Sequence, residues 1–310
     1  MNRPEYVLVG LGELLWDMLP GAKKLGGAPA NFAYHAQALR GKGVVVSCVG
    51  GDDLGREILR QLGDLGLDQK YVEVDGGHPT GTVTVELDAD GDPNYTIHED
   101  VAWDYIPFTS GSLGLAGRAD AVCFGSLCQR SEVSRTTVRQ FLKATPRGCL
   151  RIFDINLRQS FFNQETVQTM LELSNVLKLN EEELMVVANM LGVNGSETNV
   201  LNQLVERYAL RLIALTRAAN GSRLFGPGLE SNHPGFPAEI ADTVGAGDSF
   251  AAMLALGLLG DISLDRVNEH ANRVASFVCT QSGATPPLTN SLKDYLRGGG
   301  VPGAGECPGR

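Results

Sequence analysis

The chain has 310 residues, of which 43% are hydrophobic and 20% are charged, and its formal net charge is -10. This length and balance suit one large globular domain with a small appendage and a sizeable core. An acidic chain without a block of Lys and Arg is a poor candidate for binding nucleic acid or an anionic membrane, so we expect neither partner.

Short apolar runs alternate with helical patterns along most of the chain. The predicted strands are residues 6–10, 44–49, 121–124, 150–153, 176–179 and 212–216. Predicted helices lie between them at residues 28–40, 54–65, 132–143, 164–174 and 181–191, and two more follow at 247–260 and 264–280. Continuous apolar strands that alternate with helices predict a mostly parallel sheet covered on both faces.

Residues 81–98 break this rhythm. Residues 81–87 alternate between apolar and polar side chains, residues 88–92 form a turn-like acidic segment, and residues 94–98 can return as a second strand. This pattern predicts a hairpin with two different faces, standing off the main sheet. Residues 11–25 would add edge strands to it, and a small sheet over the carboxyl ends of a larger one is placed to act as a lid.

We therefore predict a division into three parts. Residues 1–10, 26–80 and 104–296 form a large α/β domain for nucleotide and substrate, and residues 11–25 and 81–103 form the small β lid. Residues 297–310 are rich in glycine and cannot bury enough apolar surface to offset their ordering entropy, which predicts a disordered tail. A lid of this kind can also pair two copies, so a homodimer through its outer face is an open alternative.

The cysteines and the apolar runs point to a soluble protein of the cytoplasm. The six cysteines show no CxxC pair and no regular spacing, as expected of free thiols in a reducing compartment. No apolar stretch approaches the roughly 20 residues of a membrane span. Nothing near the first strand resembles a signal peptide.

The segment from Asp242 to Phe250, with the sequence DTVGAGDSF, is the most informative in the chain. Its small residues Gly245, Ala246 and Gly247 precede a strongly helical run, so their N–H groups can point at one spot at the helix N-terminus, which favours an anion. Phosphoryl transfer needs such stabilisation and a base for the attacking hydroxyl, a role that Asp248 can fill. On these residues alone, a plain helix cap is an equally good interpretation.

The whole segment resembles the signature of the ribokinase-like sugar kinases, often called the pfkB family. Further matching segments follow the family's order between about Gly10 and Leu288: Gly12-Glu13 with Asp17, Gly26–Asn31, Val49–Gly55, Asp154–Arg158 and Asn180–Glu183. The resemblance implies a ribokinase-like three-layer α/β/α sandwich with a mostly parallel central sheet and a small β lid. It also implies ATP-dependent transfer of the γ-phosphate to a sugar hydroxyl, with Asp248 as the catalytic base.

The resemblance assigns binding roles residue by residue. Asp17, Gly26, Gly27 and Asn31 would contact the sugar. Asn156, Arg158, Asn180 and Glu183 would hold the phosphates of Mg–ATP, with Glu183 reaching Mg²⁺ through water. Thr216, Gly221, Asn272 and Gly283 would line the nucleotide site.

Two further features concern the nucleotide side. The family usually has glycine where this chain has Ala218, and a β-carbon there would crowd the nucleotide or shift the loop. Family members also often bind a monovalent cation beside the anion hole. The matching positions for K⁺ here are Asp242, Val244, Val278 and Gln281, mostly through carbonyl oxygens.

The substrate is best predicted from the lid. The segments 154–162 and 95–104 resemble the fructokinase branch, and Ile97-His98 stands where kinases of keto-deoxy-sugar acids often carry an arginine. We therefore expect a neutral sugar, with fructose as the first choice. Ribose, a nucleoside or 2-keto-3-deoxygluconate remains an alternative, as does a non-catalytic sugar-binding regulator on the same fold.

Other enzyme classes have weaker support. A dinucleotide fingerprint beginning at Gly10 would need a third glycine where Leu15 stands. The chain has no GxxxxGK[ST] loop, no GxSxG elbow and no histidine pair with metal-binding spacing.

Overall fold

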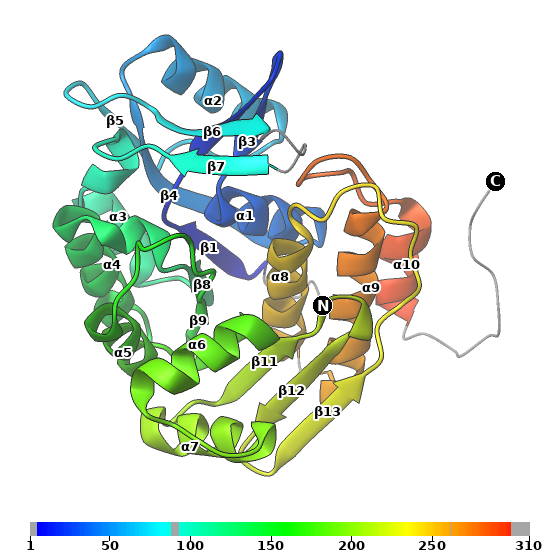
Figure 1. The fold of residues 1–310 in the computed structure, drawn as a ribbon. Helices are drawn as coiled ribbons and strands as arrows, with labels where there is room; N and C mark the ends of the chain where they lie inside the picture. The colour runs from blue at the N-terminus through cyan, green and yellow to red at the C-terminus, as the bar shows by residue number, and fades with distance from the viewer. Residues whose placement is uncertain (1–4, 88–92, 261, 299–310) are drawn as a thin grey trace.

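The computed structural model describes residues 5–87, 93–260 and 262–298. A large sheet runs through the centre of the molecule (Figure 1), with the strand order β13-β12-β11-β10-β9-β8-β1-β4-β5. Every pairing from β11 to β5 is parallel, and β12 and β13 extend one edge antiparallel. The strands are β1 (Val7–Leu11), β4 (Lys42–Gly50), β5 (Val72–Asp75), β8 (Ala121–Phe124), β9 (Leu150–Asp154), β10 (Val176–Asn180), β11 (Leu212–Thr216), β12 (Ser222–Gly226) and β13 (Leu229–His233).

Helices cover both faces of this sheet, which confirms the predicted three-layer α/β/α arrangement. One layer contains α1 (Ala28–Ala38), α8 (Ala246–Leu259), α9 (Leu264–Cys279) and α10 (Asn290–Gly298). The other contains α3 (Ser110–Ala116), α4 (Glu132–Ala144), α5 (Gln164–Leu173), α6 (Glu181–Leu191) and α7 (Glu197–Tyr208). Within the described ranges, no helix is long and apolar enough to cross a membrane.

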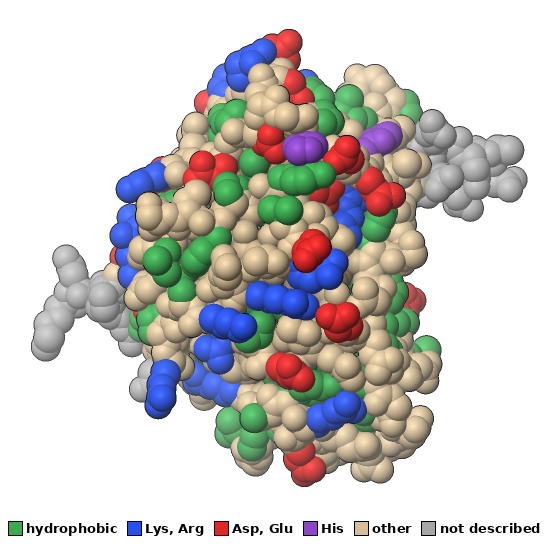
Figure 2. Space-filling view, turned by 90° about the vertical axis from the view of Figure 1, so that its left-hand side faces the viewer, with side chains coloured by type: hydrophobic (Ala, Val, Ile, Leu, Met, Phe, Trp, Pro, Cys, Tyr) green, Lys and Arg blue, Asp and Glu red, His purple; other side chains and the backbone are tan. Residues whose placement is uncertain are grey.

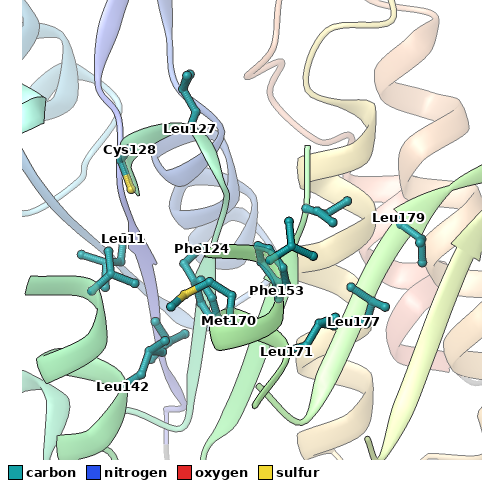
Figure 3. Close-up of a cluster of buried hydrophobic side chains, with 14 of the residues drawn as sticks. Leu11, Phe124, Leu127, Cys128, Leu142, Phe153, Met170, Leu171, Leu177 and Leu179 are labelled. Carbon is teal, nitrogen blue, oxygen red and sulfur yellow. The ribbon is translucent and has the colours of Figure 1, made fainter. Parts of the chain in front are cut away.

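The central strands are mostly apolar because both of their faces are buried. In β9, Phe153 packs with the layer of α4 and α5, whereas its neighbour Ile152 packs with the layer of α1 and α8. Figure 3 shows the first of these two clusters, in which the rings of Phe124 and Phe153 stack at 5.4 Å between centroids. Met170 reaches the same cluster from α5. Two buried faces explain why sequence periodicity predicted these strands as parallel.

A separate small sheet has the order β3-β2-β6-β7 and lies beyond the ends of the central strands (Figure 1). Its strands are β2 (Leu15–Leu19), β3 (Ala22–Gly26), β6 (Gly81–Leu87) and β7 (Pro93–Ile97), so the predicted hairpin pairs as expected. The predicted turn at residues 88–92 lies outside the described residues. One face of the sheet packs on α2 (Asp53–Asp64), where the indole N–H of the buried Trp16 donates to the carbonyl oxygen of Leu54 at 3.1 Å.

The C-terminal end differs slightly from the prediction. Helix α10 continues to Gly298, two residues into the segment predicted as a disordered tail. Leu292 of this helix is buried and Leu296 packs on the layer of α8 and α9, so the helix has an apolar face near its end. The rest of the predicted tail, residues 299–310, lies outside the described residues.

The surface has no single sign of charge on the face that carries α3, α4 and α5. Figure 2 shows Lys and Arg side chains gathered across this face, with Asp and Glu side chains set among them. Five cysteines fall within the described ranges and all are free thiols, four of them buried: Cys48, Cys123, Cys128, Cys149 and Cys279.

The contact between β1 and α1 gives a test of the packing. A β-carbon on Gly10 would lie 1.9 Å from the carbonyl oxygen of Pro29. Because backbone cannot yield as a flexible side chain can, we expect Gly10→Ala to lower the free energy of unfolding by about 3 kcal/mol. Gly148→Ala is the matched control, since nothing lies within 4 Å of its added carbon. Equal urea midpoints for the two variants would contradict this packing.

Candidate active site

Asp248 lies in the first turn of α8 and faces the first turn of α1. The Nδ2 of Asn31 donates to the Oδ2 of Asp248 at 2.8 Å, although 217 positions separate the two residues in the chain. Asn31 is buried, so this bond fixes the orientation of the carboxyl group. The sequence predicted both residues for the site, and the structure brings them together.

The start of α8 has the geometry expected of an anion site. Gly245 is the N-cap with a φ of 81°, and a β-carbon there would lie 2.4 Å from the carbonyl oxygen of Ala284. Only glycine fits both constraints. The amides of Gly247 and Asp248 belong to the first turn and have no acceptor within the helix. The amide of Ala246 is less available, because it donates to the Thr243 carbonyl oxygen at 3.3 Å.

A buried ion pair lies beneath this turn. The Nζ of Lys178, in β10, donates to both carboxylate oxygens of Asp154, at the end of β9, at 2.8 Å each. A β-carbon on Gly247 would lie 3.2 Å from the same Nζ, so the ammonium group is adjacent to the helix start. Burial lowers the pKa of Lys178, but the charge and hydrogen bonds of Asp154, together with the charges of Asp248 and Glu183, outweigh it and raise the pKa above its ordinary value.

The environment of Asp248 shifts its pKa to about 6. Burial is the largest cause, and the negative charge of Asp154 adds to it. The hydrogen bond from Asn31 and the positive charges of Lys178 and Arg158 act in the opposite direction. A carboxylate with a pKa near 6 is largely ionised at neutral pH and is a better proton acceptor than an ordinary aspartate.

Glu13 is a second unusual carboxyl in this region. It follows β1, its residue is only 3% exposed, and its Oε2 has no hydrogen-bond partner within the described ranges. Its pKa is raised to about 7, chiefly by burial; the charge of Asp248 also raises it, whereas a backbone hydrogen bond and the charge of Arg158 lower it. The pKa shift therefore shows that Glu13 lies within electrostatic reach of two residues predicted for the site.

The sequence analysis did not assign roles to Glu13 or Lys178. The sequence does contain a feature that could have identified both residues, because each is a single charged residue inside an apolar stretch. A buried charge is rare unless it is paired or functional.

The predicted sugar-binding residues of the small sheet lie close to Glu13. A β-carbon on Gly26 would lie 2.6 Å from the Oδ2 of Asp17. Gly27 has a φ of 118°, and its added carbon would lie 2.5 Å from the carbonyl oxygen of Glu13. Burial raises the pKa of Asp17, and the charges of Lys24 and Arg158 partly oppose this.

The predicted phosphate residues lie in two adjoining segments. Asn156 has a left-handed φ of 43°, and Arg158 follows it with an exposed side chain. The Oε1 of Glu183 accepts the Leu157 amide at 3.1 Å, and its Oε2 accepts the Asn180 amide at 2.9 Å. Glu183 therefore joins the loop after β9 to the start of α6.

A magnesium ion would have few protein ligands here. The described residues contain no group of three His, Cys, Asp or Glu side chains suited to a metal. Both oxygens of Glu183 already accept a backbone amide, but each retains a second lone pair. These residues fit a sparse shell in which Mg²⁺ is held through water and by phosphates.

The predicted nucleotide residues are more dispersed. Thr216 ends β11, and Gly221 needs its missing side chain because a β-carbon would lie 2.0 Å from the His233 carbonyl oxygen. Asn272 is buried, and its Nδ2 donates to the hydroxyl of Ser222 at 2.7 Å and to Asn268. Its amide is thus already committed to the packing of α9 on β12, and its contact with a nucleotide stays a prediction.

The predicted monovalent cation site already makes hydrogen bonds within the protein. The carboxylate of Asp242 accepts the amides of Val244 at 3.0 Å and Gly283 at 3.1 Å, and Lys24 lies 3.4 Å from it. The carbonyl oxygen of Val278 accepts the Gln281 amide at 3.0 Å. Each of these oxygens retains a second lone pair, so K⁺ binding here stays a prediction, and nothing below depends on it.

Two hollows lie away from these residues. One, of about 400 Å³, is lined by residues of α7 and of the connection that leads into it from α6, including Gln203 and Arg207. The other, of about 210 Å³, lies near Arg130 and Asn163. Neither contains a predicted site residue, so the candidate site is defined by its chemistry and not by the depth of a cavity.

Ala218 gives a test of the nucleotide loop. Its φ of 46° is in the left-handed region, where a β-carbon costs roughly 1–2 kcal/mol and glycine does not. We therefore expect Ala218→Gly to keep the loop conformation and to raise the free energy of unfolding by up to about 1 kcal/mol, since glycine also gains entropy in the unfolded chain. Urea denaturation measures the change. Ala188→Gly, on the buried face of helix α6, is the control and should lower the free energy of unfolding. A similar loss for Ala218→Gly would contradict backbone strain at Ala218.

Comparison with known proteins is consistent with this geometry. Residues 20–291 match the model of the pfkB family carbohydrate kinases. A fructokinase of Klebsiella pneumoniae is 31% identical over 268 residues, covering 80% of this chain and 83% of that protein.

Two solved structures are also similar. An uncharacterized sugar kinase of Pyrococcus horikoshii, in complex with ATP, is 28% identical with a TM-score of 0.77, covering 93% of this chain and 97% of that chain. The fold alone is shared with a fructokinase of Xylella fastidiosa with bound ATP, which is 20% identical with a TM-score of 0.83 over 94% of this chain and 98% of that chain. The family model spans most of the chain, and the chain therefore belongs to the pfkB family of carbohydrate kinases.

Proposed function

We propose that the protein is an ATP-dependent kinase that transfers the γ-phosphoryl group of Mg–ATP to a hydroxyl of a neutral sugar, with fructose as the first choice. One observation supports this above the others. Asp248 lies beside free amides of a helix start, is oriented by Asn31 at 2.8 Å, and has a pKa of about 6. A base beside an anion site is the pair of functions that phosphoryl transfer requires.

The proposed reaction assigns a task to each group. The sugar lies against Asp17 and Asn31, with one hydroxyl directed at Asp248. As that oxygen attacks the γ-phosphorus, its proton moves to the carboxylate of Asp248, and the bond from the γ-phosphorus to the β,γ-bridging oxygen breaks to release ADP. The amides of Gly247 and Asp248 would stabilise the charge on the transferred group.

The remaining predicted residues would position the phosphates. Arg158, which is exposed and follows the strained Asn156, would contact them. Asn180 and Glu183 would hold Mg²⁺ through water, and the bound ion would neutralise phosphate charge. The small sheet would act as a lid over the sugar, which shields the reaction from water.

Charge supports a neutral sugar over a sugar acid. Ile97 and His98 stand where an arginine would meet a substrate carboxylate, and the Nε2 of His98 contacts the hydroxyl of Thr84 at 2.8 Å. Arg130 donates to the carbonyl oxygen of His98 but is buried and paired with Asp104 at 2.8 Å, so its charge is balanced. The names of the fructokinase relatives agree with this choice. A cytoplasmic location and a homodimer through the small sheet remain parts of the proposal.

The test is magnesium-dependent ADP release with fructose, ribose, adenosine and 2-keto-3-deoxygluconate. We expect turnover on fructose and a loss of at least about 100-fold in kcat for Asp248→Asn, because the variant lacks the base. Asp265→Asn, which changes an exposed acid in the first turn of α9, should turn over normally.

Other outcomes would change the proposal in different ways. Turnover on another sugar would keep the mechanism and reject fructose. Near-normal turnover by Asp248→Asn would reject the base. Sugar binding without ADP release on any substrate would favour the regulator.

A further inference from the structure

Two adjacent lysines of β3 point in opposite directions, as side chains of a strand must. The ammonium group of Lys23 pairs with Glu57 of α2 and lies 4.8 Å from the ring centre of Trp16. The Nζ of Lys24 instead lies 3.4 Å from the Oδ2 of Asp242. Lys24 therefore connects the small sheet to the segment that leads into α8.

Asp242 organises the loops around the start of α8. Its Oδ1 accepts the amide of Val244 at 3.0 Å, and its Oδ2 accepts the amide of Gly283 at 3.1 Å. These two amide donors and the ammonium group of Lys24 all stabilise the charged form of Asp242. The residue is therefore a carboxylate at neutral pH, close in the chain to the amides of Gly247 and Asp248.

A carboxylate in this place presents an electrostatic difficulty. The amides at the helix start favour a phosphate, whereas a nearby negative charge repels one, and the chain already carries a net charge of -10. Among the residues that the structure describes, Lys24 is the one cation within ion-pair distance of Asp242. Its ammonium group can balance the charge that would otherwise weaken the anion site.

Lys24 also faces the predicted sugar site. In the antiparallel pairing of β2 with β3, Lys24 is directly opposite Asp17, and its charge lowers the pKa of that residue. Its side chain remains 49% exposed, so it lies at the opening between the small sheet and the loop before α8. One lysine thus interacts with the predicted sugar-binding carboxylate and with the loop that precedes the base.

We propose that Lys24 is a positioning residue of the phosphoryl-transfer site, which acts by neutralising Asp242 and tying the small sheet to the loop before α8. Lys24 touches no reacting atom; it acts through Asp242, which in turn holds the amides of Val244 and Gly283. This proposal rests on the proposed function, because it takes the γ-phosphate to bind at the start of α8. The proposal implies that Mg–ATP binds tightly only when the small sheet is tied to the loop before α8.

The test compares Lys24→Met with Lys23→Met, which removes the same charge from the same strand on the opposite face. We expect Lys24→Met to raise the KM for Mg–ATP about fivefold, the upper range for a partly exposed ion pair, with little change in Lys23→Met. Lys24→Arg should stay close to wild type because it keeps the charge. Adding Asp242→Asn to Lys24→Met should recover part of the loss, since the unbalanced charge is then absent.

Salt separates this electrostatic role from a structural one. Raising ionic strength with tetramethylammonium chloride should increase the KM of wild type toward that of Lys24→Met, whose own KM changes less. Parallel salt responses in the two proteins would contradict the proposal. Thermal unfolding of each variant shows whether it is folded.

Calorimetric titration with Mg–ATP distinguishes failure of this inference from failure of the proposed function. If wild type turns over but Lys24→Met has the same KM and the same ATP affinity, the role of Lys24 is wrong and the kinase function stands. If no sugar supports ADP release even in wild type, the proposed function fails. In that case the calorimetric titration tests the role of Lys24 by itself. Equal ATP affinity in wild type and Lys24→Met would overturn the inference.

Discussion

The buried ion pair between Lys178 and Asp154 is the interaction on which the rest of the candidate site depends. It joins the ends of two neighbouring parallel strands, both oxygens of Asp154 are held at 2.8 Å, and the ammonium group lies against Gly247. An uncompensated charge at this depth would cost several kcal/mol, whereas the pair as a whole is neutral. The charges of Asp154 and Lys178 act on the pKa of Asp248 in opposite directions, so their effects partly cancel. A third charged group, the proposed base Asp248, can therefore lie beside the pair.

This arrangement favours chemistry at the expense of stability. Glu13 and Asp248 have folded-state pKa values of about 7 and about 6, above their ordinary values, so the folded protein holds protons that the unfolded chain releases. Their contribution to stability is therefore favourable in acid and is lost as the pH rises through these values. Left-handed backbone adds strain at Asn156, in the predicted phosphate segment, and at Ala218, in the predicted nucleotide loop. Such costs are typical of functional sites, where position takes priority over stability.

The sequence predicted the elements whose pattern is local. The strand that ends at Asn180 and the helix that begins at Glu181 follow from an apolar run and a capping residue, and the agreement there is close. Strands β5, β12 and β13 were not predicted. β5 and β13 lie at the edges, where partial exposure removes the apolar run, and the apolar run of the buried β12 is shortened by Ser222 and Arg223. The contact between Asn31 and Asp248 could be expected only from family resemblance, since no local rule joins residues 217 positions apart. The pairing of Lys178 and the burial of Glu13 required the tertiary structure.

The central claim is that Asp248 acts as a base whose pKa is raised by burial and by Asp154. The pH dependence of kcat/KM for the sugar tests it most directly, because this quantity reports ionisation of the free enzyme. The account predicts that kcat/KM falls tenfold per pH unit on the acid side of an apparent pKa near 6, while circular dichroism shows the protein still folded. A kcat/KM that stays level down to about pH 4.5, close to the ordinary range of an aspartate, would contradict the account.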